Sequence, residues 1–256
     1  MLLASDLVDD PTRDPARELD RVHPTATRRR LWARRALRAA ISVSAFGAFV
    51  AIERSVRGGR PNAFDRGIVD AMGRARRPWL NIVAKTITFF GGVIGATGAA
   101  TGALYAARQR PRIAAQIVVG SMGGIIAELG LKGRFFARKR PTRLPHLEVV
   151  HSTSFPSGHS MAASCIYLTL AYVASRSRHL RAYRAVWLAS ATMLASSVGA
   201  TRVYLGVHWP TDVLGGLALG TAWASAAEAV FSWTGAAMVE QASGQPHVAD
   251  LPSPAI

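Results

Sequence analysis

The chain has 256 residues, of which half are hydrophobic, and a formal net charge of +16. Its single cysteine, Cys165, lies in an apolar segment, so a disulfide framework is excluded. A basic balance can suit nucleic acid, a membrane surface or anionic substrates. Here the arginines form short runs between apolar blocks and no nucleic-acid motif is present, which argues against nucleic acid as a partner.

The N-terminal segment is polar, charged and rich in arginine and proline. We expect residues 1–35 to be a mostly disordered tail, with an interfacial helix near Arg28–Arg38 as the alternative for its end. Residues 1–20 contain acidic residues and no apolar core, so we expect no signal peptide, and the first apolar block would serve as an uncleaved anchor. A second disordered tail is expected at 237–256, which leaves 36–236 as the membrane domain.

Six apolar blocks lie between the tails, at residues 36–52, 84–107, 113–131, 157–174, 185–205 and 212–235. A spanning helix needs about 20 mainly apolar residues. Four blocks reach that length, the first is slightly short, and the fourth is short unless its helix begins at Ser157. We predict an all-α fold, an integral membrane bundle of six transmembrane helices.

Glycines recur at four-residue spacing in three of these blocks, at Gly91/Gly95, Gly120/Gly124 and Gly216/Gly220. Such small residues let membrane helices pack closely, although a composition rich in glycine and alanine would give the same pattern. Between the first two blocks, the segment Phe64–Trp79 carries apolar and charged residues on different sides. It predicts a short amphipathic helix on the outer membrane surface, with a solvated loop as the alternative.

Six helices place both termini on one side of the membrane. Basic residues are almost equally numerous on the two sides, so we give most weight to the six arginines that flank the first helix, which favour an inner N-terminus. In this arrangement the end of block three, the start of block four, the end of block five and the start of block six share the outer face. Charged residues at membrane depth are costly and usually functional, and here they converge.

The sequence Pro156-Ser157-Gly158-His159 opens the fourth block. Exposed amides and the positive end of a helix favour an anion there, and Gly158 lets the backbone approach it closely. The alternative is a helix cap made by Ser157 or Ser154, with His159 incidental.

Between the last two blocks, Arg202 is followed after five residues by His208 and after three more by Asp212. The turn at 209–211 can bring Asp212 back to Nδ1–H of His208, so that Nε2 faces a substrate. The alternative is a helix cap by Thr211 or Asp212 beside an interfacial histidine.

A dense basic run follows block three, formed by Lys132, Arg134, Arg138, Lys139, Arg140 and Arg143. Phosphoryl transfer needs such groups because negative charge is spread over the equatorial oxygens. A polybasic segment can also bind anionic lipid headgroups without specificity. We expect two or three of the six side chains to touch substrate. No cluster of carboxylates that would hold magnesium is visible in the sequence.

These motifs together resemble the type 2 phosphatidic acid phosphatase superfamily, which also includes vanadium-dependent haloperoxidases. The family pattern is Lys, six residues, Arg-Pro; then Pro-Ser-Gly-His; then Ser-Arg, five residues, His, three residues, Asp. The second element is intact, and the third has Thr201 in place of Ser. The first departs, because seven residues separate Lys132 from Arg140-Pro141. Either a one-residue bulge re-aims Lys132, or Arg134 serves instead.

The resemblance implies a two-step transfer without a metal or other cofactor. In it His208 attacks phosphorus to form a phosphohistidine, Asp212 orients His208, and His159 protonates the leaving oxygen and then activates water. It also implies that the phosphoryl oxygens are held by Lys132, Arg140, Ser157, Gly158 and Arg202.

We therefore expect a lipid phosphatase of a bacterial inner (plasma) membrane, with its site on the extracytoplasmic side. Its substrate would be phosphatidate, phosphatidylglycerophosphate or a polyprenyl diphosphate, and its other partners membrane lipids. The alternatives are a lipid phosphotransferase of the same family and a phospholipid-binding or transport protein without turnover. A haloperoxidase is disfavoured because the chain is embedded in a membrane. The sequence leaves the oligomeric state open.

Overall fold

The computed structural model describes residues 24–126, 130, 138–150, 152–177 and 180–242. The chain divides into two compact units, Met1–Leu37 and Arg38–Ile256. The described part of the first unit is the beginning of one helix, in which the guanidinium of Arg35 lies over the ring of Trp32 at 5.2 Å. The second unit contains everything that follows.

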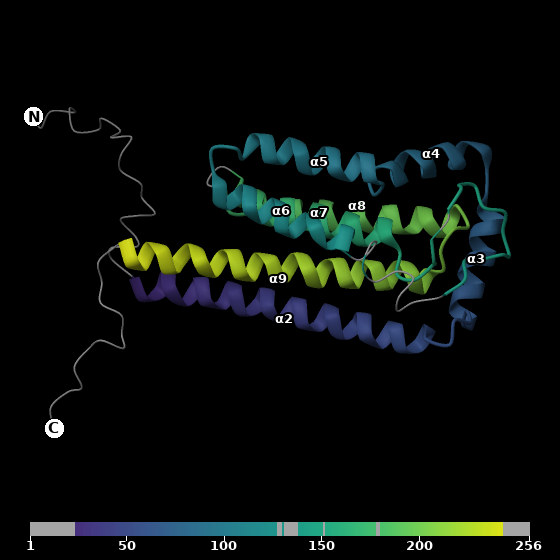
Figure 1. Cartoon of the computed structure of the whole chain (residues 1–256), viewed down its shortest axis with the longest axis horizontal. Helices are drawn as coiled ribbons and strands as arrows, with labels where there is room; N and C mark the ends of the chain where they lie inside the picture. Colours follow the sequence, from purple (N-terminus) through teal and green to yellow (C-terminus); the bar gives the residue numbers. More distant parts are fainter. Residues whose placement is uncertain (1–23, 127–129, 131–137, 151, 178–179, 243–256) are drawn as a thin grey trace, which may run out of the picture. The chain divides into compact units, whose positions relative to one another are not determined.

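The described residues form eight α-helices and no strand, which confirms the predicted all-α class (Figure 1). The helices are α2 (Pro24–Val56), α3 (Ala63–Ala75), α4 (Pro78–Phe89), α5 (Val93–Ala106), α6 (Pro111–Ile126), α7 (Gly158–Ala174), α8 (Arg184–Tyr204) and α9 (Pro210–Ala242). A short 3-10 turn, Arg181–Tyr183, precedes α8.

Two of the described helices extend into the expected tails. Helix α2 begins at Pro24, so it includes Arg28–Arg38, for which an interfacial helix was the alternative to a disordered tail. At the other end α9 continues to Ala242, past the expected boundary at 236. The rest of the two predicted tails, 1–23 and 243–256, lies outside the described residues.

The second apolar block is two helices and not one. Helices α4 and α5 meet at Gly91 and Gly92 with a bend of about 40°. A side chain at Gly91 would lie 2.2 Å from Val198 of α8, and one at Gly95 would lie 2.2 Å from the carbonyl oxygen of Phe89. The predicted glycine pair of this block therefore permits the bend and a close approach to α8.

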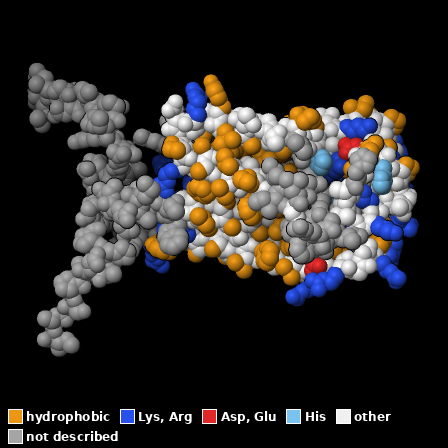
Figure 2. Space-filling view, in the orientation of Figure 1, with side chains coloured by type: hydrophobic (Ala, Val, Ile, Leu, Met, Phe, Trp, Pro, Cys, Tyr) orange, Lys and Arg blue, Asp and Glu red, His pale blue; other side chains and the backbone are white. Residues whose placement is uncertain are grey.

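Two helical segments in the described part are long and apolar enough to cross a membrane, Trp32–Val56 and Pro210–Ser232, and the bent α4–α5 pair would make a third. Large apolar side chains are exposed along several helices, among them Val43, Ile82 and Met193. In Figure 2 such side chains cover the middle of the visible face, while lysine and arginine gather towards its two ends. This distribution is that of an integral membrane protein.

Helix α7 is the most buried helix and packs against α6, α8 and α9. Glycine makes two of these contacts possible. A Cβ atom at Gly220 of α9 would lie 2.6 Å from the backbone oxygen of Met161, and one at Gly120 of α6 would lie 2.3 Å from Oγ1 of Thr169. The predicted role of small residues in helix packing is confirmed at these positions.

The predicted amphipathic segment is helix α3. Asn62 caps it, since its Oδ1 accepts a hydrogen bond from the amide of Asp65 at 2.8 Å. Val69 is fully buried and packs against Val203 of α8 and Trp209. One side of α3 therefore closes over the ends of α8 and α9.

The packing of α7 on α9 predicts a difference between two glycine substitutions. Gly220→Ala should lower the melting temperature in detergent, because its methyl group would meet the α7 backbone, and overpacking costs about 1–3 kcal/mol. Gly47→Ala in α2 has nothing within 4 Å and should leave stability unchanged or raise it. A Gly220→Ala protein as stable as Gly47→Ala would contradict the close contact of α7 with α9.

Candidate functional site

The start of α7, the end of α8 and the start of α9 meet at one end of the second unit. The amide of Ser157 donates to the backbone oxygen of Asp212 at 3.0 Å, and Oγ of Ser154 donates to the Asp212 carboxylate. The structure thus brings the second and third sequence motifs together. Lys132 and Arg134, at the expected end of the third block, lie outside the described residues.

The spacing between Arg202 and His208 has a backbone explanation. Helix α8 ends in a Schellman motif, in which Gly206 adopts a left-handed φ of +79°. The amides of Val207 and His208 then both donate to the backbone oxygen of Arg202, at 3.2 and 3.3 Å. The five residues between Arg202 and His208 complete the last turn of α8 and reverse the chain, so that His208 lies next to Arg202.

Asp212 forms one half of a capping box with Trp209, the residue that follows His208. Asp212 is the third residue of α9, after Pro210 in the first position, and its Oδ2 accepts the amide hydrogen of Trp209 at 2.8 Å. The same Oδ2 lies 3.6 Å from Nδ1 of His208. The carboxylate therefore caps α9 and lies beside the histidine ring, but at 3.6 Å it is too far from Nδ1 for a hydrogen bond in this structure.

Arg138 lies buried between two carboxylates. Its guanidinium contacts Oδ1 of Asp212 at 2.6 Å and Oδ2 of Asp65 at 2.5 Å, and it donates to Oγ1 of Thr211 at 2.7 Å. Asp65 also accepts hydrogen bonds from the amide and hydroxyl of Thr211. All three charged side chains are at most 3% exposed. This member of the basic run therefore holds Asp212 within the protein.

The sequence interpretation missed Asp65, although a signal was present. Asp65 shares one side of α3 with Ile68, Val69 and Met72, at the spacing of a helical stripe. A carboxylate within an apolar stripe is costly to bury unless it is paired. Its partner could not be identified from the sequence because Arg138 and Thr211 follow it at distances of about seventy and one hundred and fifty residues.

Arg140 contacts the nitrogen that faces away from Asp212. Its Nη1 lies 3.0 Å from Nε2 of His208 and donates to the backbone oxygen of Val207 at 2.6 Å, while its Nε donates to the backbone oxygen of Ser152. Because arginine can only donate, Nε2 is the acceptor and the ring proton belongs on Nδ1. This is the tautomer that the sequence analysis expected.

Arg202 is almost fully buried and extends from the last turn of α8. It donates to Oγ1 of Thr88 at 2.9 Å and pairs with Oε2 of Glu148 at 2.5 Å. The loop carrying Glu148 is anchored to α8, because the amide of Leu147 donates to the backbone oxygen of Leu205. Thr88 and Glu148 were not among the predicted site residues, and neither belongs to a motif.

The second motif opens α7 as expected. Ser157 is the N-cap of this helix, and its Oγ accepts hydrogen bonds from the amide and the hydroxyl of Ser160, so the capping interpretation holds for its side chain. Gly158 and His159 are the first two helical residues. Nε2 of His159 faces the α4–α5 bend, since a Cβ atom at Gly92 would lie 3.5 Å from it.

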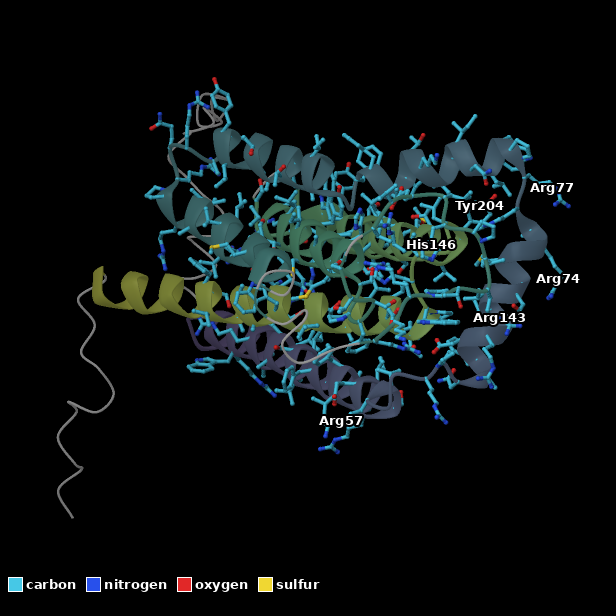
Figure 3. The ribbon with its side chains drawn as sticks, turned by 45° about the vertical axis from the view of Figure 1, so that its right-hand side comes forward. Arg57, Arg74, Arg77, Arg143, His146 and Tyr204 are labelled. Atoms are coloured by element: carbon cyan, nitrogen blue, oxygen red, sulfur yellow. The ribbon has the colours of Figure 1, made fainter. Side chains whose placement is uncertain are left out.

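The remaining described members of the basic run lie away from His208. Arg143 forms an exposed ion pair with Asp70 of α3, and this pairing lowers the pKa of Asp70. Figure 3 shows Arg143 with Arg74 and Arg77 on the right-hand side of the view, at and beside α3. Lys139 contributes its backbone oxygen to the indole N–H of Trp209. Of the described run, only Arg140 contacts His208.

Burial decides the protonation of His208. Its side chain is 2% exposed, and removal from water lowers its pKa from 6.5 to about 4, against the opposing effect of Asp212. The neighbouring charges of Arg140 and Arg202 act in the same direction as burial. At neutral pH His208 is therefore a neutral imidazole with its lone pair on Nε2. Among the described residues, no cluster of His, Cys, Asp and Glu is arranged to hold a metal ion.

Comparison with known proteins gives matches over most of this region. A model of the PAP2 superfamily matches residues 86–236. The chain is 33% identical over 193 residues to phosphatidylglycerophosphatase B of Bacillus subtilis (strain 168), covering 70% of this chain and 88% of that protein. It is 40% identical over 77 residues to a lipid A 1-phosphatase of Rhizobium johnstonii, covering 30% of this chain and 27% of that protein.

Two solved structures resemble the fold. A transmembrane PAP2-type phosphatidylglycerolphosphate phosphatase from Bacillus subtilis gives a TM-score of 0.61 at 30% identity, covering 78% of this chain and 96% of that one. LpxE of Aquifex aeolicus gives a TM-score of 0.51 at 24% identity, covering 68% and 96% of the two chains, which is a likeness of fold alone.

The low pKa of His208 predicts how stability depends on pH. The unfolded chain binds a proton at His208 below about pH 6.5, whereas the folded protein does so only near pH 4. Stability should therefore fall as pH is lowered from 6.5 towards 4, by on the order of 3 kcal/mol from this group. His208→Gln, which does not titrate, should lose less stability over this range. The free energy of unfolding of both proteins is measured by denaturant titration at pH 7.5 and 4.5. If both lost the same amount between the two pH values, His208 would not be held neutral.

Proposed function

Since this chain belongs to the PAP2 superfamily, we propose that it is a lipid phosphatase that hydrolyses the phosphate monoester or diphosphate of a membrane lipid through a phosphohistidine. The family match covers more than half of the chain. The observation that carries the proposal is a buried, neutral His208 with Arg140 at Nε2 and Asp212 beside Nδ1. Those are the requirements of a nitrogen nucleophile for phosphorus.

In the first step, Nε2 of His208 attacks phosphorus and the bond from phosphorus to the lipid oxygen breaks. His159 supplies the proton that the leaving oxygen takes. The imidazole becomes positively charged as it bonds to phosphorus, and Asp212 next to Nδ1 stabilises that charge. In the second step, His159 accepts a proton from water, the water oxygen bonds to phosphorus, and the bond to His208 breaks.

The phosphoryl oxygens would be held by Arg140, Arg202 and the start of α7 at Ser157 and Gly158. Arginine is suited to this because its donors form a planar fork. In the absence of substrate, the lone pair of Nε2 accepts a hydrogen bond from Nη1 of Arg140. A phosphoryl oxygen that accepts this hydrogen bond instead would free the lone pair. Substrate binding would thereby expose the nucleophile. Lys132 stays a predicted fifth member of this set.

Glu148 is the carboxylate with which a phosphate must compete for Arg202. Its side chain is about one quarter exposed, and its loop is anchored to the end of α8 by the hydrogen bond from Leu147 to Leu205. A dianionic phosphoryl group would displace this single carboxylate from Arg202, because two negative groups at one guanidinium repel each other.

Among the substrates considered, phosphatidylglycerophosphate has most support. The relative named as a phosphatidylglycerophosphatase aligns over most of its length, whereas the lipid A 1-phosphatase aligns over about a quarter of its own. Phosphatidate and polyprenyl diphosphates share the phosphate and the apolar tail and remain alternatives. Exposed apolar side chains along the helices would keep the tails of any of them in lipid.

We place the catalytic domain at residues 36–236 with six transmembrane passes, in which the bent α4–α5 pair counts as one. Helices α6, α7 and α8 have 16, 17 and 21 residues. At 1.5 Å per residue they are about 24–32 Å long, close to the thickness of a bilayer core. With the N-terminus inside, the site opens at the extracytoplasmic face of the plasma (inner) membrane of a bacterium.

A phosphotransferase of the same family would form the same phosphohistidine and pass the group to an alcohol instead of water. A lipid-binding protein without turnover would not need His208 to be neutral with Asp212 at Nδ1. The buried geometry of His208 therefore favours a reaction over binding alone, and the acceptor distinguishes the two reactions.

Phosphate release by the purified protein in detergent tests the reaction. With EDTA present, we expect phosphate from phosphatidylglycerophosphate at a higher rate than from phosphatidate or a polyprenyl diphosphate. His208→Ala should reduce release to background, because it removes the nitrogen that forms the covalent intermediate in the proposed reaction. His146→Gln, which removes an imidazole from the outer loop, should retain most of the activity.

Two results would contradict this function. One is phosphate release by His208→Ala at a rate near that of the unchanged protein. The other is loss of activity in EDTA that magnesium restores. Transfer of labelled phosphate to added glycerol in preference to water would instead identify a phosphotransferase.

The buried pair of Asp65 with Arg138 predicts a positioning role for Asp65. Asp65→Asn should lower kcat by on the order of tenfold with KM little changed, because Arg138 and Thr211 then hold Asp212 less firmly behind His208. Asp65→Glu should recover part of kcat, since it restores the negative charge.

Asp70→Asn is the matched control for this prediction. Asp70 lies on the same helix but its ion pair with Arg143 is exposed, and such pairs contribute little. It should change neither kcat nor KM. If Asp65→Asn raised KM at constant kcat, or if Asp70→Asn had the same effect, Asp65 would not act through Asp212. Size-exclusion profiles establish that each variant is folded.

A further inference from the structure

The two histidines of the proposed reaction differ in exposure. His208 is 2% exposed, whereas His159 is only half-buried. In phosphoryl transfer the attacking and leaving atoms lie roughly in line, on opposite sides of phosphorus. A phosphoryl group that Nε2 of His208 attacks therefore has its leaving oxygen on the side of His159, where the protein is less closed. The rest of the lipid must lie on that same side.

The surface next to His159 is the bend between α4 and α5. A Cβ atom at Gly92 would lie 3.5 Å from Nε2 of His159, and one at Gly91 would lie 3.1 Å from the backbone oxygen of His159. Thr88, one turn earlier, accepts a hydrogen bond from Arg202 at its hydroxyl and one from the amide of Gly92 at its backbone oxygen. The bend is therefore next to both a phosphate held by Arg202 and a leaving oxygen at His159.

The backbone of Gly92 does not require glycine. Gly92 is the N-cap of α5, with φ −76° and ψ 168°, an extended conformation that any residue adopts. A Cβ atom there would be in ordinary van der Waals contact with the backbone oxygen of Phe89, at 3.4 Å, and with Nε2 of His159. A side chain larger than alanine would then fill the space beside Nε2. What glycine provides at this position is room next to the imidazole.

The bend is fixed to the helix that carries His159, and it has apolar side chains on its exposed side. The hydroxyl of Tyr167 in α7 donates to the backbone oxygen of Phe90 at 2.6 Å. Phe89, Phe90 and Ile94 are exposed, and the two phenylalanine rings meet edge to face. Figure 1 shows α4 and α5 at the edge of the bundle. Exposed apolar side chains of a membrane helix lie in the hydrocarbon, where the tails of a lipid also lie.

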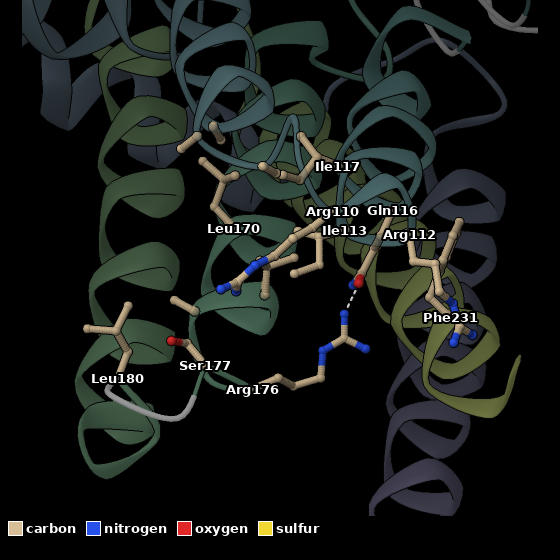
Figure 4. Close-up of a pocket in the computed structure, with 15 residues that line it drawn as sticks. Arg110, Arg112, Ile113, Gln116, Ile117, Leu170, Arg176, Ser177, Leu180 and Phe231 are labelled. Atoms are coloured by element: carbon tan, nitrogen blue, oxygen red, sulfur yellow. Dashed lines mark hydrogen bonds between the residues drawn. The ribbon is translucent and has the colours of Figure 1, made fainter. Parts of the chain in front are cut away.

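The large cavity of the protein does not provide room for the leaving group. It has a volume of about 700 Å³, and Figure 4 shows Leu170, Arg176 and Leu180 among its lining, near the end of α7. Val173, which also lines it, is separated from His159 by roughly 20 Å along α7. The carbon bonded to the leaving oxygen therefore cannot lie in this cavity.

We propose that Gly92 determines the specificity for a lipid leaving group, because the carbon chain that follows the leaving oxygen crosses the α4–α5 bend between Gly92 and His159. The inference rests on the proposed reaction. In that reaction Nε2 of His208 bonds to phosphorus, the bond from phosphorus to the lipid oxygen breaks, and this oxygen takes its proton from Nε2 of His159. A side chain at position 92 would obstruct a lipid more than it would obstruct water, the smallest leaving group.

Two activities of the purified full-length protein in detergent compare these leaving groups. The first is kcat/KM for phosphate release from phosphatidylglycerophosphate, whose leaving group is a phospholipid. The second is the exchange of oxygen between inorganic phosphate and isotopically labelled water. In this exchange phosphate forms the phosphohistidine with loss of water, and labelled water then hydrolyses it. Both activities use His208 and His159, so they differ in the size of the leaving group.

Gly92→Val should lower kcat/KM for the lipid by about tenfold or more, because a displacement of about 1 Å at a reacting centre can cost that much. Exchange should fall less, so that the ratio of lipid release to exchange also falls. Gly92→Ala should lower this ratio by a smaller factor. The alanine variant decides the test if the valine variant does not fold, which size-exclusion profiles establish.

Gly98→Val is the matched control. Gly98 lies in the same helix and is exposed, and a Cβ atom there would have nothing within 4 Å. This variant should leave the ratio of the two activities unchanged. The role of Gly92 would be overturned if Gly92→Val released phosphate from the lipid as fast as Gly98→Val, or if it lowered both activities by the same factor.

Failure of the proposed reaction would look different. If the unchanged protein released phosphate from the lipid but catalysed no exchange, the phosphohistidine would be contradicted, and the inference about Gly92 with it. A result against Gly92 alone appears only in its variants, with both activities intact in the unchanged protein. The two failures are therefore distinguishable.

Discussion

The arrangement of the catalytic end depends on one buried carboxylate, that of Asp212. It forms an ion pair with Arg138 and accepts hydrogen bonds from the hydroxyl of Ser154 and the amide of Trp209. It also lies beside Nδ1 of His208. These partners come from the loop before α7 and from the start of α9, and Asp65 joins α3 to them through Arg138. Leaving a buried charge without its partner costs about 3–5 kcal/mol, so these elements are held together as one unit.

The arginines at this end of the protein differ in whether they pair with Asp212. Arg138 is neutralised by Asp65 and Asp212, and its guanidinium is closed off from solvent. Arg140 and Arg202 instead surround His208 and lower its pKa together with burial. Arginine therefore has two roles at this end of the protein. Arg138 holds the carboxylates of Asp65 and Asp212 in place, whereas Arg140 and Arg202 would bind a phosphate. Of these last two, Arg202 is paired with Glu148.

Several features could be predicted because they depend on residues close together in sequence. The apolar blocks, the start of α7 at the Pro-Ser-Gly-His motif and the approach of Asp212 to His208 each follow from local spacing. The bend at Gly91 was missed, because block two is apolar on both sides of it. The need for glycine there comes from the close contacts with Val198 and with the backbone of Phe89, which only the folded structure shows. The sequence left two alternatives for the segment before the first block, a disordered tail or a helix near Arg28–Arg38, because a run of arginine suits both; the structure has a helix from Pro24.

By itself, the sequence determined the all-helical class, the family and the proximity of Asp212 to His208, since hydropathy and short motifs act through local geometry. Only the tertiary structure decided which basic residues face the histidine. Arg138 and Arg140 are two residues apart in one run, yet one is buried between carboxylates and the other contacts Nε2. Their neighbours Asp65 and His208 are distant in the chain, so the difference arises only when α3, α8 and α9 pack together.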